Sequence, residues 1–243
     1  MHSSKQKTLT AAQLREFYHD DFLEDQIRDF QACLFPDGKP FEGVIVDVGG
    51  GGGYFAQALK EKLGYQVRVV DADSKSVNAC LQRGIDATIG DCASMQFNKD
   101  DRIICFNLIL HHLVADNEEM TIALQSRTLR NCHGNARKVF VNEYIYESYI
   151  NNFSGLLIYK ITSSAILSAI GKTISRIVPS FRANTFGTGV RFRSHEEWRR
   201  LFQNSGLSVS KTLTGMEEKV DLPLRLLLIK SIRRDSFLLE SDI

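Results

Sequence analysis

Hydrophobic positions alternate along the chain between short apolar runs and longer amphipathic stretches. Short apolar runs are typical of buried strands, and apolar positions three to five residues apart predict helices. The runs predict strands at 44–48, 67–70, 87–89, 103–109 and 138–142. The longer patterns predict helices at 9–35, 54–63, 74–83 and 117–131. Strands and helices therefore alternate, which predicts an α/β fold with a parallel sheet covered on both faces.

The pattern changes in the second half. No Asp or Glu occurs from Ser148 to His195, where six basic residues and many apolar residues predict one or two inserted helices. Those basic residues are Lys160, Lys172, Arg176, Arg182, Arg191 and Arg193. The pattern then predicts a helix at 195–205 and a strand at 207–212, followed by a last apolar run at 224–232. The strand and the apolar run are expected to form an antiparallel pair at one edge of the sheet.

Composition adds few constraints. The 243 residues suit one domain, and 43% apolar residues allow a sizeable core. A net charge of +1 gives no general case for binding nucleic acid. Five scattered cysteines without C-x-x-C spacing predict free thiols in a reducing compartment, and no metal site is predicted. With no signal-like start and no long apolar run, we expect a cytoplasmic protein.

Five consecutive glycines, Gly49–Gly53, lie between the first strand and the next helix. Glycine allows a backbone to approach a ligand closely. The dinucleotide pattern G-x-G-x-x-G fails, because Tyr54 and Phe55 occupy the position of its third glycine in the two registers. This disfavours a nicotinamide oxidoreductase. The pattern that fits is D-x-G-x-G-x-G, formed by Asp47, Gly49, Gly51 and Gly53.

Four motifs in order, IVDVGGGGG, VRVVDADS, IGDCAS and CFNLILHHL, resemble those of the class I S-adenosylmethionine-dependent methyltransferases. The resemblance covers residues 40 to 145, and each motif lies at the carboxyl end of a strand, where open α/β sheets bind ligands. It implies a Rossmann-like, doubly wound, mostly parallel seven-stranded sheet with helices on both faces and a helical lid insert. The chain departs from the family at Arg102, where many members have Asp at the start of the fourth strand.

The resemblance implies S-adenosyl-L-methionine as co-substrate. Asp71 would hold the ribose hydroxyls, and Asp91 would bind the adenine. Asp47 either contacts the donor or only organises the glycine turn through backbone N–H groups, and Asp91 has an alternative as a turn residue. The donor-binding candidates are Asp47, Gly49, Gly51, Gly53, Asp71, Ala72, Asp91, Cys92, Phe106 and Asn107. Gly50 and Gly52 occupy positions that relatives fill freely, so we expect Gly52→Ala to be milder than Gly51→Ala.

The catalytic candidates are His111, His112 and Tyr18. A histidine titrates in the range that suits a general base, although either one could instead pack on the donor. Glu143, Tyr144 and Tyr146 leave the fifth strand toward the same rim, and His19 shares the first helix with Tyr18.

The acceptor is expected to be a small apolar or aromatic molecule of natural-product or quinone-like biosynthesis, methylated on O or N, and an anionic acceptor is one option. The N-P-P-Y tetrapeptide of nucleic-acid and protein enzymes is absent, since the chain has Phe106-Asn107-Leu108-Ile109. The acid-free insert is interpreted as the acceptor pocket, as a cap with solvated cations, or as a peripheral membrane contact serving a lipid or quinone acceptor. A non-catalytic binding partner or sensor is the alternative from a different class.

The chain divides into four predicted parts. They are an N-terminal helical cap (1–40), a donor-binding core (41–147), a lid and acceptor insert (148–193) and a C-terminal helix with a strand pair (194–243). The oligomeric state stays open, with a dimer among the options.

Overall fold

The computed structural model describes residues 20–35, 41–132, 138–164, 167–169 and 189–241. The predicted helix at 9–35 is therefore described only as α2, Asp20–Leu34. Tyr18 and His19 lie outside the described residues, as do Lys172, Arg176 and Arg182.

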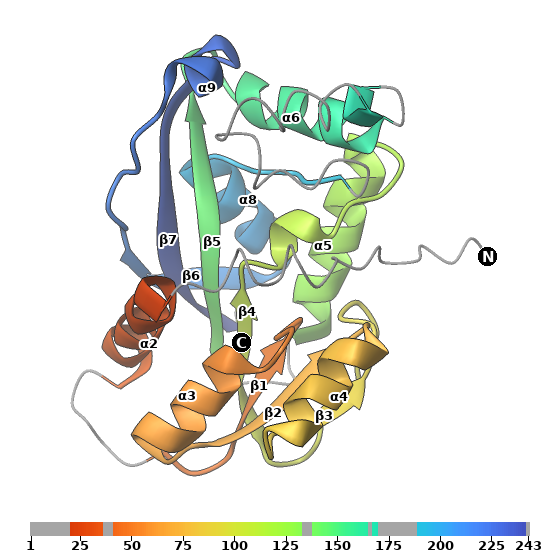
Figure 1. The fold of residues 1–243 in the computed structure, drawn as a ribbon, viewed down its shortest axis with the longest axis vertical. Helices are drawn as coiled ribbons and strands as arrows, with labels where there is room; N and C mark the ends of the chain where they lie inside the picture. The colour runs from red at the N-terminus through yellow and green to blue at the C-terminus, as the bar shows by residue number, and fades with distance from the viewer. Residues whose placement is uncertain (1–19, 36–40, 133–137, 165–166, 170–188, 242–243) are drawn as a thin grey trace.

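Seven strands form one sheet in the order β3-β2-β1-β4-β5-β7-β6 (Figure 1). Strands β1 to β5 are parallel, and β7 runs antiparallel to both β5 and β6. This confirms the predicted fold class. The chain turns back between β1 and β4, which is the switch point where such sheets bind ligands. The strands are Val44–Val48, Gln66–Asp71, Asp86–Ile89, Asp101–Asn107, Lys138–Ser148, Leu207–Leu213 and Ile229–Ser241 for β1 to β7.

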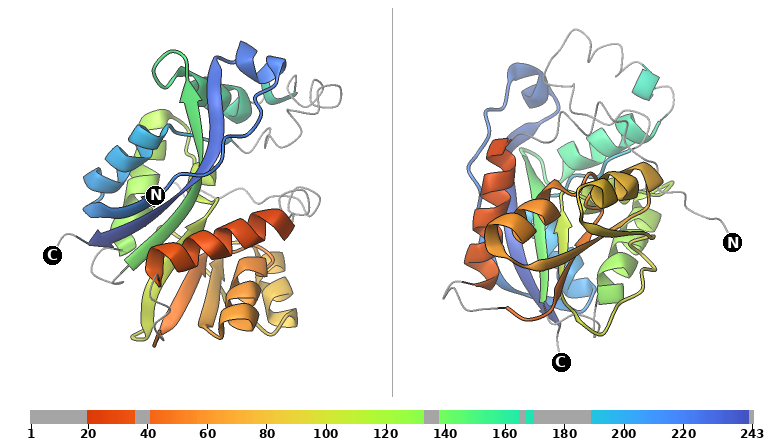
Figure 2. Two further views of the ribbon diagram at one scale, coloured as in Figure 1. Left: turned by 90° about the vertical axis from the view of Figure 1, so that its left-hand side faces the viewer. Right: turned by 60° about the horizontal axis from the view of Figure 1, so that its bottom comes forward.

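Helices cover both faces of the sheet (Figures 1 and 2). The aromatic core of one face joins Phe30 of α2 to Phe55 of α3 and Phe140 of β5, and α4 extends the same layer. The other face packs α5 and α8, with Trp198 and Phe202 buried against the sheet. Two further helices, α6 and the short α9, lie near the end of β5. The helices are α3 Tyr54–Leu63, α4 Ser74–Gln82, α5 Glu118–Cys132, α6 Phe153–Ser163, α8 His195–Asn204 and α9 Leu222–Leu226.

The last apolar run, predicted as a strand at 224–232, is a strand only from Ile229, where β7 begins, and β7 pairs antiparallel with β6 at the sheet edge as predicted. Residues Leu222–Leu226 form α9, which begins after Asp221 with a proline in its first turn, and β7 continues to Ser241. The strand extends through charged residues because Asp235 is buried between Arg233 and His195, with His195 Nδ1 2.7 Å from Asp235 Oδ2. Pairing with β7 also carries β5 to Ser148, beyond its predicted end at 142.

The departure at Arg102 has a structural explanation. Val44 of β1 pairs with Asp101, and Ile45 pairs with Ile103, so Arg102 is an extra residue in β4. Asp101 is the first residue of β4 and is buried, and its carboxylate accepts hydrogen bonds of 3.0 and 2.6 Å from Arg68. An acid therefore opens the fourth strand after all, one position earlier.

We predict that Asp101→Ala lowers the free energy of unfolding by about 3–5 kcal/mol, because it leaves the Arg68 guanidinium buried without its partner. Urea unfolding of the full chain measures this. The double variant Arg68→Met/Asp101→Leu should recover much of the loss, since an apolar pair needs no desolvation of charge. A single variant as stable as the native chain would contradict the assignment.

Candidate functional site

The glycine loop joins β1 to α3 at the switch point. Gly49, Gly51 and Gly53 have positive φ values of 69°, 54° and 76°, a region that favours glycine. They are the three glycines that fit the sequence motif. Gly53 is also the N-terminal cap of α3, so the loop ends with the backbone turning directly into the helix.

The two intervening glycines differ from each other. A Cβ added at Gly50 would lie 2.4 Å from Asp47 Oδ2, so the expectation that position 50 is freely filled is wrong in this chain. A Cβ at Gly52 would meet the ring edge of Tyr54 at 2.9 Å, which a side-chain rotation can relieve. The loop lies directly on the Asp47 carboxyl.

Asp47 and Asn107 leave buried polar atoms unpaired at the ends of β1 and β4. Within the described residues, neither oxygen of Asp47 and neither polar atom of the Asn107 side chain has a hydrogen-bond partner. Burial raises the pKa of Asp47 to about 7, and the Asn107 side chain opposes this rise, although no hydrogen bond of regular geometry joins the two. Unpaired buried polar groups are costly, so a ligand is expected to satisfy them.

Asp71 organises the glycine loop. Its Oδ2 accepts the Gly51 N–H at 3.0 Å, and its Oδ1 accepts the Asp73 N–H at 2.8 Å. Burial raises its pKa, and these two N–H groups oppose the rise. The alternative in which Asp47 holds the turn through backbone N–H groups is therefore wrong, and Asp71 has that role.

The remaining donor-binding candidates line the ends of β2 to β4 to different degrees. Asp91 is exposed and accepts the Ala93 N–H at 2.9 Å, as a turn residue does. Cys92 is buried, and burial raises the pKa of its thiol to about 12, which disfavours a reactive thiolate. Phe106 is wholly buried in the core, whereas Ala72 is half-buried beside Asp71.

At the carboxyl ends of β4 and β5, a histidine contacts a buried glutamate. The short 3₁₀ turn Leu110–His112 carries His111, whose Nδ1 lies 2.7 Å from Glu143 Oε2. Glu143 Oε1 accepts the Leu110 N–H at 2.7 Å, so one buried carboxylate holds both the turn and the ring. Sequence reasoning placed Glu143 at this rim but did not predict the pairing. The signal was the adjacency of the two parallel strands, whose ends meet at one edge of the sheet.

His112 differs from His111. Its ring centroid lies 4.1 Å from that of His111, and burial together with the neighbouring His111 holds its pKa well below the usual range. His112 is therefore neutral at physiological pH.

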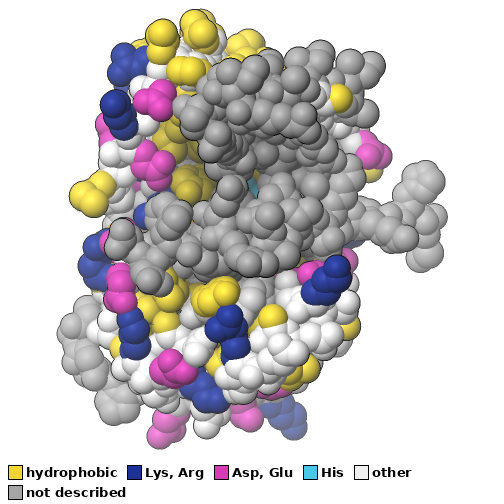
Figure 3. Space-filling model, viewed as in Figure 1, with side chains coloured by type: hydrophobic (Ala, Val, Ile, Leu, Met, Phe, Trp, Pro, Cys, Tyr) yellow, Lys and Arg dark blue, Asp and Glu magenta, His cyan; other side chains and the backbone are white. Residues whose placement is uncertain are grey.

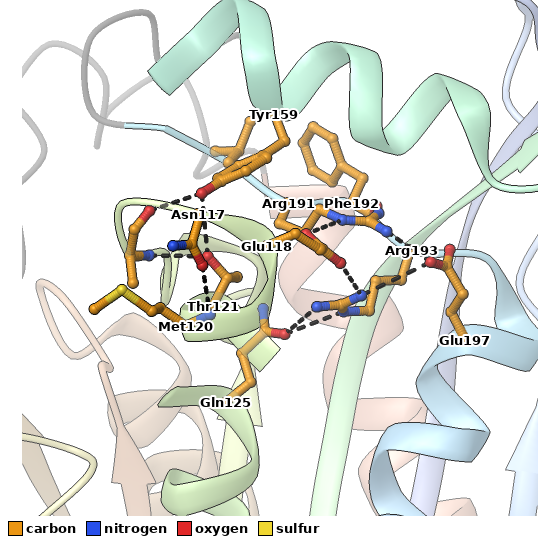
Figure 4. Close-up of polar contacts among 12 residues, drawn as sticks. Asn117, Glu118, Met120, Thr121, Gln125, Tyr159, Arg191, Phe192, Arg193 and Glu197 are labelled. Atoms are coloured by element: carbon orange, nitrogen blue, oxygen red, sulfur yellow. Dashed lines mark hydrogen bonds and ion pairs between the residues drawn. The ribbon is translucent and has the colours of Figure 1, made fainter. Parts of the chain in front are cut away.

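Two arginines of the insert belong to a buried network (Figure 4). Arg191 donates to Glu118 at 2.9 Å and to Glu197 at 2.6 Å, and Arg193 donates to the other Glu118 oxygen at 3.0 Å. Arg193 also donates twice to Gln125, at 3.0 and 2.7 Å. Both arginines are thus neither solvated cations nor free partners for an anionic acceptor, and both interpretations are wrong at these positions.

The network reaches the histidine turn. Gln125 Nε2 donates to the Leu110 carbonyl at 2.9 Å, and the Arg191 N–H donates to the His111 carbonyl at 2.8 Å. The turn is held on one side by Glu143 and on the other by Gln125 and Arg191. Sequence reasoning did not identify Gln125, because nothing near it in the chain marks it.

Aromatic rings form a wall beside His111. Phe192 stacks on the His111 ring with centroids 4.9 Å apart and on Tyr146 at 4.2 Å. Tyr144 meets both His111 and Phe192 edge-on. Burial raises the pKa of Tyr144 to about 12, so its phenol stays protonated. Phe192 was not among the predicted site residues.

Within the described part of the chain, no group of three or more His, Cys, Asp or Glu residues is placed to hold a metal ion. Among the same residues, no helix has both the length and the apolar character needed to cross a bilayer.

Residues 45–131 match the family model described as "Methyltransferase domain". A comparison with curated proteins finds no match to the chain. The family match covers the glycine loop, Asp71, Asp91 and the histidine turn.

Solved structures share the fold at low identity. Magnesium protoporphyrin IX methyltransferase from Synechocystis PCC 6803, solved with S-adenosylhomocysteine (SAH), is 15% identical, with a TM-score of 0.55 over 95% of this chain and 93% of that one. The mitomycin 7-O-methyltransferase MmcR is 15% identical (TM-score 0.51, 95% of this chain), and LepI, solved with SAH and a substrate analogue, is 14% identical (0.53, 88%). This chain spans about half the length of the last two proteins, 58% and 46%.

We predict that Gly50→Ala lowers stability by about 1–3 kcal/mol, because the new methyl group overlaps the Asp47 carboxyl. Gly52→Ala should cost less. Thermal unfolding of both variants measures the difference. The double variant Gly50→Ala/Asp47→Ala lacks the carboxyl that the new methyl group would overlap. Its stability should therefore be close to that of Asp47→Ala alone. Equal effects of Gly50→Ala and Gly52→Ala would contradict this account of the loop.

Proposed function

We propose that the chain is a class I S-adenosylmethionine-dependent methyltransferase, which transfers the donor's methyl group to oxygen or nitrogen of a small apolar or aromatic acceptor. One observation carries the proposal. The buried Asp47 carboxyl and Asn107 amide have no partners among the described residues, and both lie next to a glycine loop at the switch point of the sheet.

The residues present fit this donor. A cationic group beside Asp47 would favour its ionised form and supply the missing contact. Glycine at position 49 leaves room against Ile109, since a Cβ there would lie 2.5 Å from its side chain. Each Asp71 oxygen that binds a loop N–H keeps capacity for a ribose hydroxyl. When bound, the donor supplies a methyl group on a positively charged sulfur.

The acceptor side is apolar and aromatic. Phe192, Tyr144 and Tyr146 surround one side of His111, and aromatic rings suit a flat or hydrophobic acceptor. Two of the fold relatives are described as methyltransferases of mitomycin and of magnesium protoporphyrin IX, both small ring-containing molecules. An anionic acceptor gains no support from Arg191 and Arg193, since both are already paired with carboxylates.

His111 is the proposed general base. With its Nδ1–H donated to Glu143, the ring presents Nε2 as a proton acceptor for an acceptor O–H or N–H. Glu143 and the Gln125 contact fix the orientation of the turn, so the ring need not reorganise during the reaction. His112 is proposed to pack on the donor side of the turn rather than to exchange protons.

We predict that Asp71→Ala weakens binding of SAH by about 10- to 100-fold, because the variant loses ribose contacts and two loop hydrogen bonds. Isothermal titration calorimetry with the full chain measures the affinity. The matched control is Asp73→Ala, which removes the side-chain contacts to the Lys75 N–H and the Ser76 hydroxyl at the start of α4 and keeps the backbone N–H that binds Asp71. Unchanged affinity in Asp71→Ala would overturn the donor assignment, and tight NADH binding by the native chain would revive the oxidoreductase.

We predict that Glu143→Gln lowers kcat at least about 100-fold while SAH affinity stays within about twofold, because only the orientation of His111 is lost. Methyl transfer to a panel of phenols, hydroquinones, heteroaromatics and amines identifies an acceptor and gives kcat. Glu147→Gln, on the same strand and facing Arg233, is the control. Donor binding without turnover on any panel member would instead support a sensor or partner subunit.

A further inference from the structure

Large hydrophobic side chains are exposed at one end of the molecule. Leu222 and Leu226 of α9 are 71% and 77% exposed. They are four residues apart, so they lie on one face of the helix. Tyr149, Ile150 and Phe153, in and just after the turn between β5 and α6, are exposed as well. We call these five residues the apolar end.

The two segments of the apolar end adjoin each other. The Tyr149 N–H donates to the Leu228 carbonyl at 2.9 Å, and Ser154 Oγ donates to the Leu227 carbonyl at 2.8 Å. Figure 1 places α9 beside the start of α6, and Figure 3 shows hydrophobic side chains gathered at the same upper end of the molecule, with Lys and Arg side chains next to them. The exposed side chains therefore form one surface.

Two residues with an unusual backbone conformation lie in the turns that carry the apolar end. Asn151 in the β5–α6 turn and Leu228 between α9 and β7 have positive φ values of 38° and 60°. Leucine rarely adopts such a conformation, so the surrounding structure must enforce it. The strained residues lie at the two turns that carry the apolar end.

The two segments that carry the apolar end contain basic residues but no acidic ones. No Asp or Glu occurs in 148–169 or in 222–234, and the exposed cations there are Lys160, Arg225 and Lys230. Acidic residues precede α9 at 217, 218 and 221. Lys160, Arg225 and Lys230 therefore lie in the same two segments as the exposed apolar side chains, and the acidic residues lie on the N-terminal side of α9.

We propose that the apolar end docks on an anionic membrane surface. Leu222, Leu226 and the aromatic rings of Tyr149 and Phe153 would enter the interfacial layer, and Lys160, Arg225 and Lys230 would face lipid phosphates. Apolar side chains flanked by aromatic and basic residues are the composition of an interfacial anchor. The surface includes α9, which lies outside the 148–193 segment that the sequence suggested for membrane contact. The proposal does not rest on methyl transfer.

The apolar end continues into the interior. Leu224 and Leu227 pack on a cluster that contains Ile158, Ile229 and Phe192, and Phe192 stacks on His111. Docking of the protein through the apolar end would bring this apolar cluster close to the bilayer.

The test is flotation of the full chain with vesicles of phosphatidylcholine alone or mixed with anionic phosphatidylglycerol. The native chain should float with the mixed vesicles, more weakly with phosphatidylcholine, and less at high salt. Leu222→Asp/Leu226→Asp should reduce flotation at least about tenfold. Arg225→Gln/Lys230→Gln should remove the preference for anionic lipid. Leu81→Asp, at a leucine of α4 that is 52% exposed, is the matched control and should float normally.

Circular dichroism and SAH binding establish that each variant is folded. Absence of flotation by the native chain, or equal flotation of Leu222→Asp/Leu226→Asp, would overturn the proposal. If light scattering instead finds a native dimer that this double variant dissociates, with no flotation, the surface is an interface between copies and the membrane proposal is refuted.

Discussion

Buried charge at the carboxyl side of the sheet has to be neutralised inside the protein, and Glu118 does this for two arginines at once. Arg191 and Arg193 are almost fully buried, so each requires anionic or strongly polar partners. Their shared partner lies at the start of α5, and Glu197 and Gln125 complete the shell. This set of contacts joins the end of the insert to α5 and α8, and through Gln125 it reaches the turn that carries His111. The position of the histidine turn therefore depends on a network of ion pairs and hydrogen bonds whose two arginines are almost fully buried.

The glycine loop and the strand ends around it, the proposed donor site, could be predicted from sequence far better than the proposed acceptor site. A glycine loop, Asp71 and the strand-end motifs are local patterns, and their spacing fixes where a parallel sheet must place them. The alternate glycines 49, 51 and 53 are the ones with positive φ, as the pattern requires. The sequence pattern could not distinguish the roles of Asp47 and Asp71, because both acids lie at the carboxyl ends of neighbouring strands. Only the three-dimensional structure assigns the Gly51 N–H to Asp71 and shows that Asp47 has no hydrogen-bond partner among the described residues.

The proposed acceptor site, at the histidine turn, depends on contacts between residues far apart in the chain. Arg191 and Glu118 are 73 positions apart, and no local periodicity links them. A cation in a segment without acids looks solvated or ligand-binding until its distant partner is known. Contacts outside the local sequence also explain β7, because its charged residues do not follow the pattern typical of a buried strand. They are accommodated because Asp235 is matched by His195 and Arg233 from other positions.

The additional residue in β4 affects how chains of this kind are compared. A column-by-column alignment would set Arg102 against the acid of other members and score the position as a charge reversal. The fold treats it as an insertion, because Asp101 keeps the ion pair with Arg68 and the pairing with β1 resumes one residue later. An alignment that opens a one-residue gap here recovers the acid. A sequence comparison made without that gap would miss an ion pair that the three-dimensional structure shows directly.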